Sequence, residues 1–330
     1  MKQRACGLLA AVFLAVAFGG MTTAGQSGTA DTHIAAARAA AGKDHAFMFE
    51  TLCVQALAGL NTPAAPQGRG GQPAGPPARA AWYAEPVKVF DNLYFVGTKV
   101  HGAWAVTTSD GIIVIDALYD YAAEPEIADG LKKLGLDPTK IKYVVISHGH
   151  GDHHGGAKFL QDQFAPHLIL SATDWDMVER DTRNPVPPRD MVATDGQKLT
   201  LGGETLTLYI TPGHTPGTIS TLVPVKEAGQ SHLAAEWGGT VITPATPIPM
   251  LQAYVKSATR FRDVAEGAGA DVIITNHTAF DGTLTKLDAL RTRKPGDPNP
   301  YIVGKDAVRR YLIVAEECGK ATLAAAQARQ

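Results

Sequence analysis

Short runs of β-branched and aromatic residues, separated by turn residues, recur along most of the chain and predict strands. In the first half of the chain these runs lie at 87–90, 93–96, 103–107, 112–115, 141–147 and 168–171. In the second half they lie at 198–201, 205–211, 219–225, 233–237 and 271–275. Each half of the chain therefore supplies its own set of strands.

Longer segments with apolar residues at helical spacing lie between these strands and predict helices. They are found at 124–134, 157–164, 173–180, 251–266 and 306–325. Because each set of strands is accompanied by helices, we expect two sheets packed face to face with helices on the outside.

The residues ahead of the first strand fall into parts of different composition. Residues 1–24 combine a positive start (Lys2, Arg4), a short apolar run and small residues up to Ala24, which is the pattern of a secretory signal peptide. An uncleaved membrane anchor is the alternative interpretation of these residues. Residues 25–61 are rich in alanine and contain no proline. Their apolar residues have near-helical spacing, which predicts one or two helices.

A stretch dense in proline and glycine, 62–81, separates this N-terminal segment from the predicted strands. It has almost no large apolar side chains, so we interpret it as a linker. The catalytic domain is then expected to span 82–330. No stretch after the signal peptide is long and apolar enough to cross a bilayer, so we expect a periplasmic or secreted protein with no membrane span in the mature chain.

Composition adds two restrictions. The chain is 45% hydrophobic and 19% charged, with a formal net charge of −2, as is ordinary for a soluble globular protein. A general nucleic-acid binder usually carries a concentrated basic face. We therefore expect a small-molecule substrate and no nucleic acid, while the oligomeric state stays open.

Two cysteines, Cys53 and Cys318, remain in the chain after removal of the predicted signal peptide. An oxidising compartment would allow them to pair, but the sequence does not show whether their Cα atoms come within bridging reach. Their pairing is left open. Neither cysteine has the spacing of a metal ligand.

Histidines follow three of the predicted strands. The run His148-Gly149-His150-Gly151-Asp152-His153 follows the predicted strand 141–147. His214 follows the strand 205–211, and His277 follows the strand 271–275. Ligands on loops at one edge of a rigid sheet make a preorganised site. Imidazole and carboxylate ligands without thiolate suit zinc, and iron or manganese remain alternatives. A solvated polar turn is the competing interpretation of the histidine run.

At these residues the chain resembles the metallo-β-lactamase superfamily. The H-x-H-x-D-H motif appears at 148–153, a T-P-G-H-T-P-G motif appears at 211–217, and Asp116 follows Ile115 at a strand end. The resemblance covers about 82–330. It implies an α+β fold, the four-layer αββα sandwich, with two Zn²⁺ ions at one edge of the sheets.

The resemblance also implies a set of ligands. The first zinc would be held by His148, His150 and His214, and the second by Asp152, His153 and His277. Asp116 would support the metal loop through hydrogen bonds. A local capping role without influence on the metal is the alternative for Asp116.

One departure from the family is informative. Many hydrolases of the superfamily, such as glyoxalase II and the lactonases, have an aspartate that bridges both metals on a strand after the third histidine. Here no aspartate occurs between Asp195 and Asp263, and the corresponding segment contains Glu236-Trp237-Gly238-Gly239. The ligand set then resembles the β-lactamase subclass with an Asp-His-His second site. Whether Glu236 replaces the bridge stays open.

This resemblance implies a zinc-dependent hydrolase in which a hydroxide held by the metals attacks a carbonyl, with a β-lactam amide as the leading substrate class. Asp152 would have a catalytic role, because it would orient the nucleophile as well as bind metal. A lactone, thioester or other ester is the alternative substrate, and a metal-binding protein without turnover is a third hypothesis.

His101 and Trp104 are expected either to line the pocket or to pack within their loop, and His154 is expected to point away.

Overall fold

The computed structural model describes residues 29–61, 75–242 and 246–329. The predicted signal peptide, residues 1–24, lies outside the described residues, as does most of the predicted linker. A single helical turn, α4 (Arg79–Trp82), includes the last three residues of the predicted linker and leads towards the first strand. The Trp82 side chain is buried.

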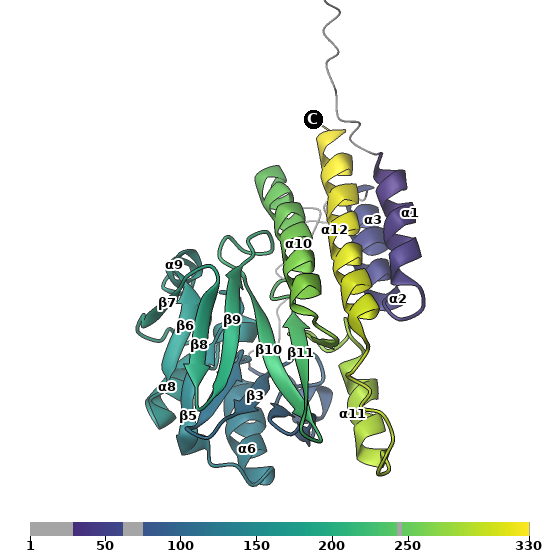
Figure 1. Cartoon of the computed structure of the whole chain (residues 1–330). Coiled ribbons are helices and arrows are strands. Elements are labelled where there is room, and N and C mark those ends of the chain that lie inside the picture. Colours follow the sequence, from purple (N-terminus) through teal and green to yellow (C-terminus); the bar gives the residue numbers. More distant parts are fainter. Residues whose placement is uncertain (1–28, 62–74, 243–245, 330) are drawn as a thin grey trace, which may run out of the picture.

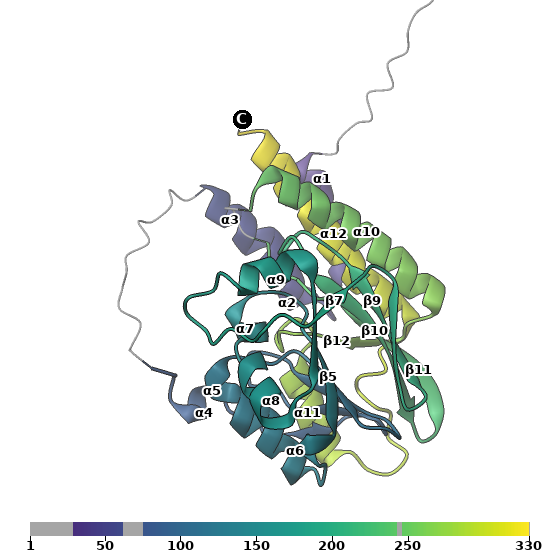
Figure 2. The same ribbon diagram turned by 90° about the vertical axis from the view of Figure 1, so that its left-hand side faces the viewer.

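Two β-sheets lie face to face, and helices cover the outer face of each (Figures 1 and 2). In Figure 1, α6, α8 and α9 lie on the side of one sheet, while α10 and α12 lie on the side of the other. The chain thus has the predicted four-layer αββα sandwich.

The first sheet has seven strands in the order β1-β2-β3-β4-β5-β6-β7. They are β1 (Val87–Lys88), β2 (Leu93–Phe95), β3 (Trp104–Thr107), β4 (Ile112–Ile115), β5 (Ile141–Val145), β6 (His167–Ser171) and β7 (Met191–Ala193). Pairing is antiparallel from β1 to β4 and parallel from β4 to β7. All four residues of β4 are buried, because helices cover one face and the second sheet covers the other.

The second sheet has five strands in the order β12-β11-β10-β9-β8. They are β8 (Gln197–Leu201), β9 (Glu204–Ile210), β10 (Ile219–Glu227), β11 (Gln230–Glu236) and β12 (Val272–Ile274). Only the β11–β12 pair is parallel among these neighbours. This arrangement brings the ends of β9 and β12 to the same edge of the molecule as the end of β5.

Helices complete the outer layers. On the first sheet lie α5 (Asp120–Ala122), the π-helical turn η2 (Ala123–Ala128), α6 (Asp129–Lys133), α8 (Ala157–Phe164) and α9 (Ala172–Val178). On the second sheet lie α10 (Ile248–Ala268) and α12 (Lys305–Gln327). A 3₁₀ turn, η3 (Pro138–Lys140), precedes β5, and α11 (Thr283–Thr292) follows the loop after β12.

Three apolar clusters correspond to the three interfaces between layers. Ile115 and Leu206 belong to the cluster between the sheets, Val144 and Leu160 belong to the cluster under the first helical layer, and Phe261 belongs to the cluster under α10 and α12. Each strand that contributes to two clusters is apolar on both faces. The sheets are therefore held rigidly, which fixes the loops at their edges.

The N-terminal segment is helical, as its composition predicts, and it packs outside α12 (Figure 1). It consists of α1 (Ala30–Ala41), α2 (Ala46–Phe49), the π-helical turn η1 (Glu50–Gln55) and α3 (Ala56–Asn61). Cys53 and Cys318 form a disulfide, which settles the pairing that the sequence left open. Both side chains are fully buried.

Strand β7 and helix α11 are among the elements that the sequence predictions lack. Strand β7 has three residues, too few for a period to be recognised, and it forms because β6 provides a parallel partner. Helix α11 begins directly after Gly282, and only Thr283 and Leu287 of its residues are buried. Such a weak apolar stripe gives little sequence signal.

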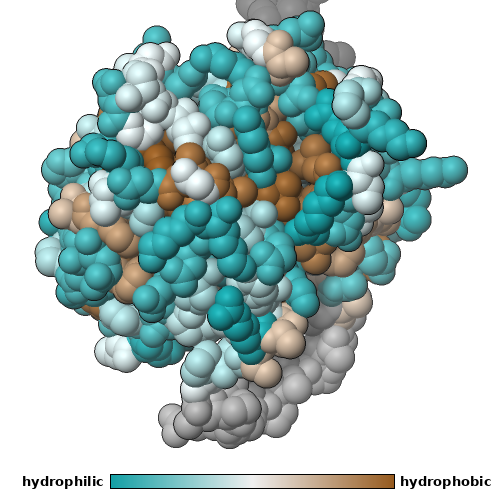
Figure 3. Space-filling view, turned by 90° about the horizontal axis from the view of Figure 1, so that it is seen from below, coloured by the Kyte–Doolittle hydropathy of each residue, from teal (hydrophilic) through white to brown (hydrophobic). Residues whose placement is uncertain are grey.

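The surface seen from below is hydrophilic around a central hydrophobic patch (Figure 3). Among the described residues, the large apolar side chains with most exposure are Phe47, Val100, Val192 and Leu284. No helix within the described ranges is both long and apolar enough to cross a membrane.

Candidate metal centre

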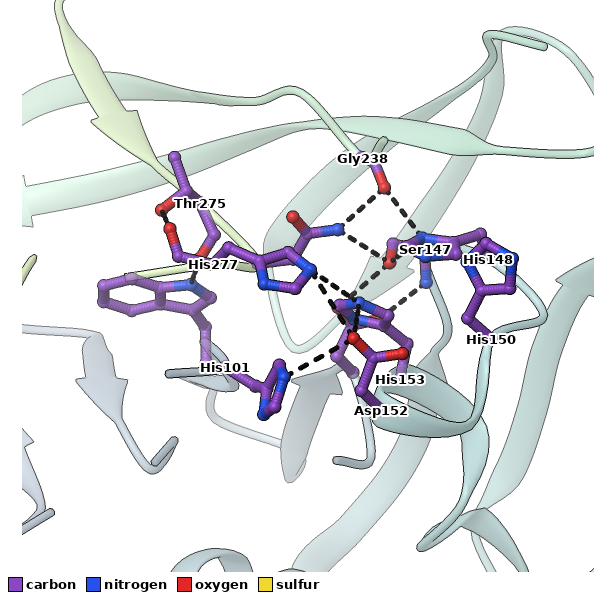
Figure 4. A network of polar contacts seen from close by, with 12 residues as sticks. His101, Ser147, His148, His150, Asp152, His153, Gly238, Thr275 and His277 are labelled. Carbon is purple, nitrogen blue, oxygen red and sulfur yellow. Dashed lines mark hydrogen bonds and ion pairs between the residues drawn. The ribbon is translucent and has the colours of Figure 1, made fainter. Parts of the chain in front are cut away.

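Three loops meet at one edge of the two sheets. The first follows β5 and contains His148 to His153, partly in the short helix α7 (Gly151–His154). The second follows β9 and contains His214, and the third follows β12 and contains His277. All six predicted ligands converge in this region, which is drawn in part in Figure 4.

The first cluster contains His148, His150 and His214. The Nε2 atom of His214 lies 3.1 Å from Nε2 of His148 and 3.0 Å from Nδ1 of His150. The potential ligand atoms of all three rings lie within 4.8 Å of one another. The cluster therefore has the geometry for three imidazoles to share one ion.

The second cluster is built around the Asp152 carboxylate. Its Oδ2 atom lies 3.2 Å from Nε2 of His153 and 3.6 Å from Nε2 of His277, and these two nitrogens are 3.2 Å apart. A fourth residue, His101, also reaches this cluster, with its Nε2 atom 3.5 Å from the same Asp152 oxygen.

These separations fit a transition-metal ion. With zinc–ligand bonds of about 2.0–2.2 Å, two ligand atoms of a tetrahedral site lie about 3.3–3.6 Å apart. The atom pairs of both clusters are separated by 3.0–3.6 Å. Imidazole and carboxylate donors without thiolate also match the ligands that zinc accepts.

Electrostatics at the first cluster favour the form of histidine that binds metal. Burial and the neighbouring His150 together lower the pKa of His214 to about 4. Burial and the nearby His153 hold the pKa of His148 well below its ordinary value. Both rings are therefore neutral near pH 7, as a ligand to metal has to be.

His153 differs because it lies between two carboxylates. Burial opposes its charge, but Asp152 and Asp116 together raise its pKa to about 10. The same carboxylates would attract a metal cation, which could replace the proton at Nε2. The second cluster thus concentrates negative charge where an ion would lie.

Asp116 holds the loop of His148 to His153 in place through hydrogen bonds to His153 and to Ser147, the residue that precedes the loop. Its Oδ2 atom accepts hydrogen bonds from Nδ1 of His153 at 2.7 Å and from Oγ of Ser147 at 2.9 Å, and its Oδ1 atom accepts from the Ser147 amide at 2.7 Å. Because Nδ1 of His153 donates to Asp116, its Nε2 atom faces the cluster. Asp116 has a positive φ of 63°, which Asp tolerates better than most residues.

The carbonyl of Gly238 orients His148 in a similar way. It accepts hydrogen bonds from Nδ1 of His148 at 2.9 Å and from Nδ2 of Asn276 at 2.7 Å (Figure 4). A Cβ atom on Gly238 would lie 1.7 Å from the carbonyl oxygen of Ile219, so only glycine fits here. His214 is fixed through Nδ1, which donates to the carbonyl of Val241.

Asp174 in α9 connects two of the loops, and no sequence pattern pointed to it. Its Oδ2 atom accepts hydrogen bonds from the Gly149 amide at 2.9 Å and from Oγ1 of Thr215 at 2.6 Å. Burial raises the pKa of this carboxyl. Asp174 lies in a helix distant in sequence from both loops, so only the tertiary fold reveals this role.

Glu236 does not take part in either cluster. It ends β11, where it pairs with Thr221 and Ile274, and its side chain is completely buried. Burial and the nearby Asp116 carboxylate raise the pKa of Glu236 well above its ordinary value. The glutamate that the sequence left open as a bridge therefore lies buried behind the clusters.

The structure distinguishes between the two roles that the sequence left open for His101 and Trp104. Trp104 does not line a pocket, because its ring is buried against Phe95 and its Nε1–H donates to the carbonyl of Thr275. His101, from the same segment, lies at the second cluster. His154 turns away from the clusters, and its Nε2 atom lies 3.0 Å from Oδ2 of Asp181.

A cavity of about 360 Å³ opens beside the clusters. It is lined by Tyr119, His150, Gly151, Asp152, Arg183 and Asn184. The Arg183 side chain is 82% exposed, and its Nε atom lies 3.7 Å from Asp181. Potential metal ligands and an exposed cationic side chain therefore face the same space.

Residues 97–227 match the sequence model of the metallo-β-lactamase superfamily. A hydroxyacylglutathione hydrolase of Synechococcus sp. is 32% identical over 210 residues, which cover 61% of this chain and 70% of that relative. The chain belongs to the metallo-β-lactamase superfamily. The N-acyl homoserine lactonase AttM of Azorhizobium caulinodans is 30% identical over 205 residues, covering 56% of this chain and 74% of the lactonase.

Solved structures with this fold include metallo-β-lactamases. BJP-1, a subclass B3 metallo-β-lactamase of Bradyrhizobium japonicum, superposes with a TM-score of 0.64 at 24% identity, covering 77% of this chain and all of BJP-1. A metallo-β-lactamase of Cronobacter sakazakii superposes with a TM-score of 0.64 at 29% identity, covering 76% of this chain and 98% of that enzyme. This metallo-β-lactamase superfamily member is thus a hydrolase with residues for a divalent metal.

Proposed function

We propose that this protein is a binuclear zinc hydrolase that opens the amide of a β-lactam. The observation that carries the proposal is the composition of the second cluster, in which Asp152, His153 and His277 meet and no carboxylate in the described part of the chain reaches both clusters. Superfamily hydrolases of lactones and thioesters are the ones expected to carry such a bridge.

The bound metal and the residues of the site would have different roles in hydrolysis. Bound zinc would supply Lewis-acid chemistry, since it acidifies a coordinated water to a pKa of about 7 and polarises a carbonyl. Asp152 lines the cavity, where its carboxylate would accept a hydrogen bond from the attacking water and orient it. Asp116 and the Gly238 carbonyl keep the histidine tautomers fixed during turnover.

Arg183 supports a substrate that carries a carboxylate. Its exposed guanidinium lines the cavity that Asp152 and His150 also line. Guanidinium binds carboxylate through paired hydrogen bonds. A β-lactam antibiotic carries such a carboxylate next to its amide ring.

A second candidate is hydrolysis of a thioester or lactone by the same site. This candidate is supported by sequence similarity to the hydroxyacylglutathione hydrolase and to the N-acyl homoserine lactonase. Glutathione thioesters also carry carboxylates that Arg183 could bind, whereas an acyl homoserine lactone carries none. Arg183 therefore favours a thioester over a lactone as the second candidate.

We also propose that the protein is exported. The pattern of residues 1–24 supports a signal peptide, and the Cys53–Cys318 disulfide is of the kind that persists in an oxidising compartment. A small-molecule substrate that reaches the periplasm would agree with this location.

The test is a panel of three substrates assayed with zinc-loaded protein: a chromogenic cephalosporin, a hydroxyacylglutathione thioester and an acyl homoserine lactone. We expect the highest kcat/KM with the cephalosporin. A higher kcat/KM with the thioester or lactone would transfer the assignment to that class. Lack of turnover with all three substrates would contradict both candidates.

Arg183→Gln tests carboxylate recognition separately from chemistry. We expect KM for a carboxylate-bearing substrate to rise about tenfold with kcat nearly unchanged, because the charge contributes to binding in both ground and transition states. Arg180→Gln, a neighbouring arginine that does not line the cavity, is the matched control. An unchanged KM in Arg183→Gln would contradict this role.

A further inference from the structure

The loop before β3 is closed tightly on itself, and this fixes the position of His101. The hydroxyl of Thr98 accepts hydrogen bonds from the amides of His101 at 2.8 Å and Val100 at 3.1 Å. The Thr98 amide donates in return to the carbonyl of His101 at 2.8 Å. The backbone at His101 is therefore held by its own loop.

The same loop is joined to the loop that carries His277. The Gly102 amide donates to the carbonyl of Asn276 at 2.9 Å, and the Thr278 amide donates to the carbonyl of Val100 at 3.0 Å. A Cβ atom at Gly102 would lie 2.1 Å from the carbonyl oxygen of Thr275, so glycine is needed for this approach. His101 is thereby held beside His277, with which it forms a β-bridge.

The imidazole of His101 points into the second cluster (Figure 4). Its ring centroid lies 5.1 Å from that of His277 and 5.3 Å from that of Tyr119, whose edge contact supports it. Its Nε2 atom lies within 4.8 Å of the ligand atoms of both His277 and Asp152.

The distances between His101 and its neighbours fit ligands that share one ion. The His101 Nε2 to Asp152 Oδ2 distance of 3.5 Å is longer than the 2.7 Å of the His153–Asp116 hydrogen bond. It instead matches the 3.2–3.6 Å that separate the same oxygen from His153 and His277. It also falls within the range of about 3.3–3.6 Å for two ligands of one tetrahedral zinc.

We propose that His101 is a fourth protein ligand of the second metal, which would then be bound by one aspartate and three histidines. The inference rests on the proposed binuclear site and extends it by one residue. A site with four protein ligands is saturated in tetrahedral geometry, whereas a site with three keeps an open position. The open position for substrate would then belong to the first metal, at His148, His150 and His214.

The test is the metal affinity of His101→Ala in the full-length exported protein. Stepwise binding of Zn²⁺ and Co²⁺ is measured by competition with a chromophoric chelator, and the Co²⁺ absorption spectrum reports the coordination number. We expect second-site affinity to fall at least about tenfold, as is typical even for residues that only support a ligand. First-site affinity should be unchanged.

Two variants calibrate this measurement. His277→Ala removes a predicted second-site ligand and gives the size of a ligand effect. His167→Ala removes a histidine whose side chain is 62% exposed and which pairs with Asp190, so it should leave both affinities unchanged. Added imidazole should restore second-site affinity in His101→Ala, which a purely structural role would not allow.

The outcomes separate this inference from the proposed function. A second-site affinity in His101→Ala within twofold of the wild type, even with lower turnover, would overturn the ligand assignment. Loss of affinity without rescue by imidazole would also overturn it. If the affinity falls and is rescued while the wild type hydrolyses none of the panel substrates, His101 is a ligand and the proposed function fails.

Discussion

At the scale of single residues, the metal centre depends on hydrogen bonds that fix three of its imidazoles before any ion binds. His148, His153 and His214 each use Nδ1 to donate to an oxygen atom, from Gly238, Asp116 and Val241 respectively. The Nε2 atom of each ring is then directed into the clusters. Such support usually matters nearly as much for affinity as the ligands themselves.

Asp116→Asn should therefore weaken the second site without disturbing the fold. Asn tolerates the positive φ at this position. Its amide oxygen can still accept from the Ser147 backbone, but its NH₂ group then faces Nδ1 of His153 and favours the tautomer with the proton on Nε2. We expect second-site zinc affinity to fall about 10–100-fold in chelator competition.

Asp110→Asn, at an exposed turn, is the control for this substitution. Wild-type affinity in Asp116→Asn would support the alternative from the sequence, a local capping role.

Glu126, which lies outside the metal centre, has a pH-dependent effect on the stability of the fold. Glu126 is buried, and its Oε1 atom accepts a hydrogen bond from the Ala84 amide at 2.9 Å. Burial raises the pKa of Glu126 from 4.5 to about 8. Between these two pKa values the folded protein retains a proton that the unfolded chain loses. The contribution of Glu126 to stability is therefore fully present below pH 4.5 and is lost as the pH rises to about 8.

Glu126→Gln removes this titration. We expect the Tm of the wild type to drop by several degrees relative to Glu126→Gln between pH 5 and pH 9, measured by differential scanning fluorimetry of both proteins. A Tm difference that is the same at both pH values would contradict the raised pKa.

At the scale of elements, the N-terminal helices are attached to the sandwich by one covalent bond and one helix face. The π-helical turn η1 carries Cys53 and α12 carries Cys318, and the two are 265 positions apart in the sequence. His33 in α1 adds a contact at 2.7 Å to Glu317 of α12. None of these residues belongs to the metal loops.

Replacing both cysteines by serine should lower stability but not metal content. The disulfide restricts the unfolded chain, and such bonds typically stabilise by about 2–4 kcal/mol, or roughly 4–16 °C in Tm for a domain of this size. Thermal melting and metal analysis check the two parts. Dithiothreitol should lower the Tm of the wild type and leave the double variant unchanged; an equal effect on both would contradict the mechanism.

At the scale of the whole molecule, the metal centre connects both sheets. Ligands come from the end of β5 in the first sheet and from the ends of β9 and β12 in the second. An ion bound by all three loops cross-links the two layers. Metal that binds only the folded state stabilises it by mass action, by about 4 kcal/mol per site at a thousandfold excess over Kd.

Removal of metal by a chelator should therefore lower the Tm as well as abolish hydrolysis. Both should return on addition of Zn²⁺. A melting temperature that does not respond to verified metal removal would contradict ligands shared between the sheets, and full activity of metal-free protein would contradict the proposed chemistry.

The sequence by itself determined the sandwich and the identity of the six candidate ligands. Strands 112–115 and 141–147 were recognisable because residues buried on both faces form continuous β-branched runs, and the strand 205–211 was recognisable from its alternating pattern. The histidines were recognisable because their spacing reflects a local turn, which the chain encodes within a few residues.

Only the tertiary structure placed His101 and Asp174 at the site. His101 lies 176 positions before His277, and Asp174 belongs to a helix with no motif, yet both are held at the metal loops by hydrogen bonds between distant segments. Glu236 and Trp104 were not separable from pocket residues in the sequence, because burial depends on what packs against a strand. Contacts between elements distant in the chain leave no periodic trace, and this is why they appear only in the folded protein.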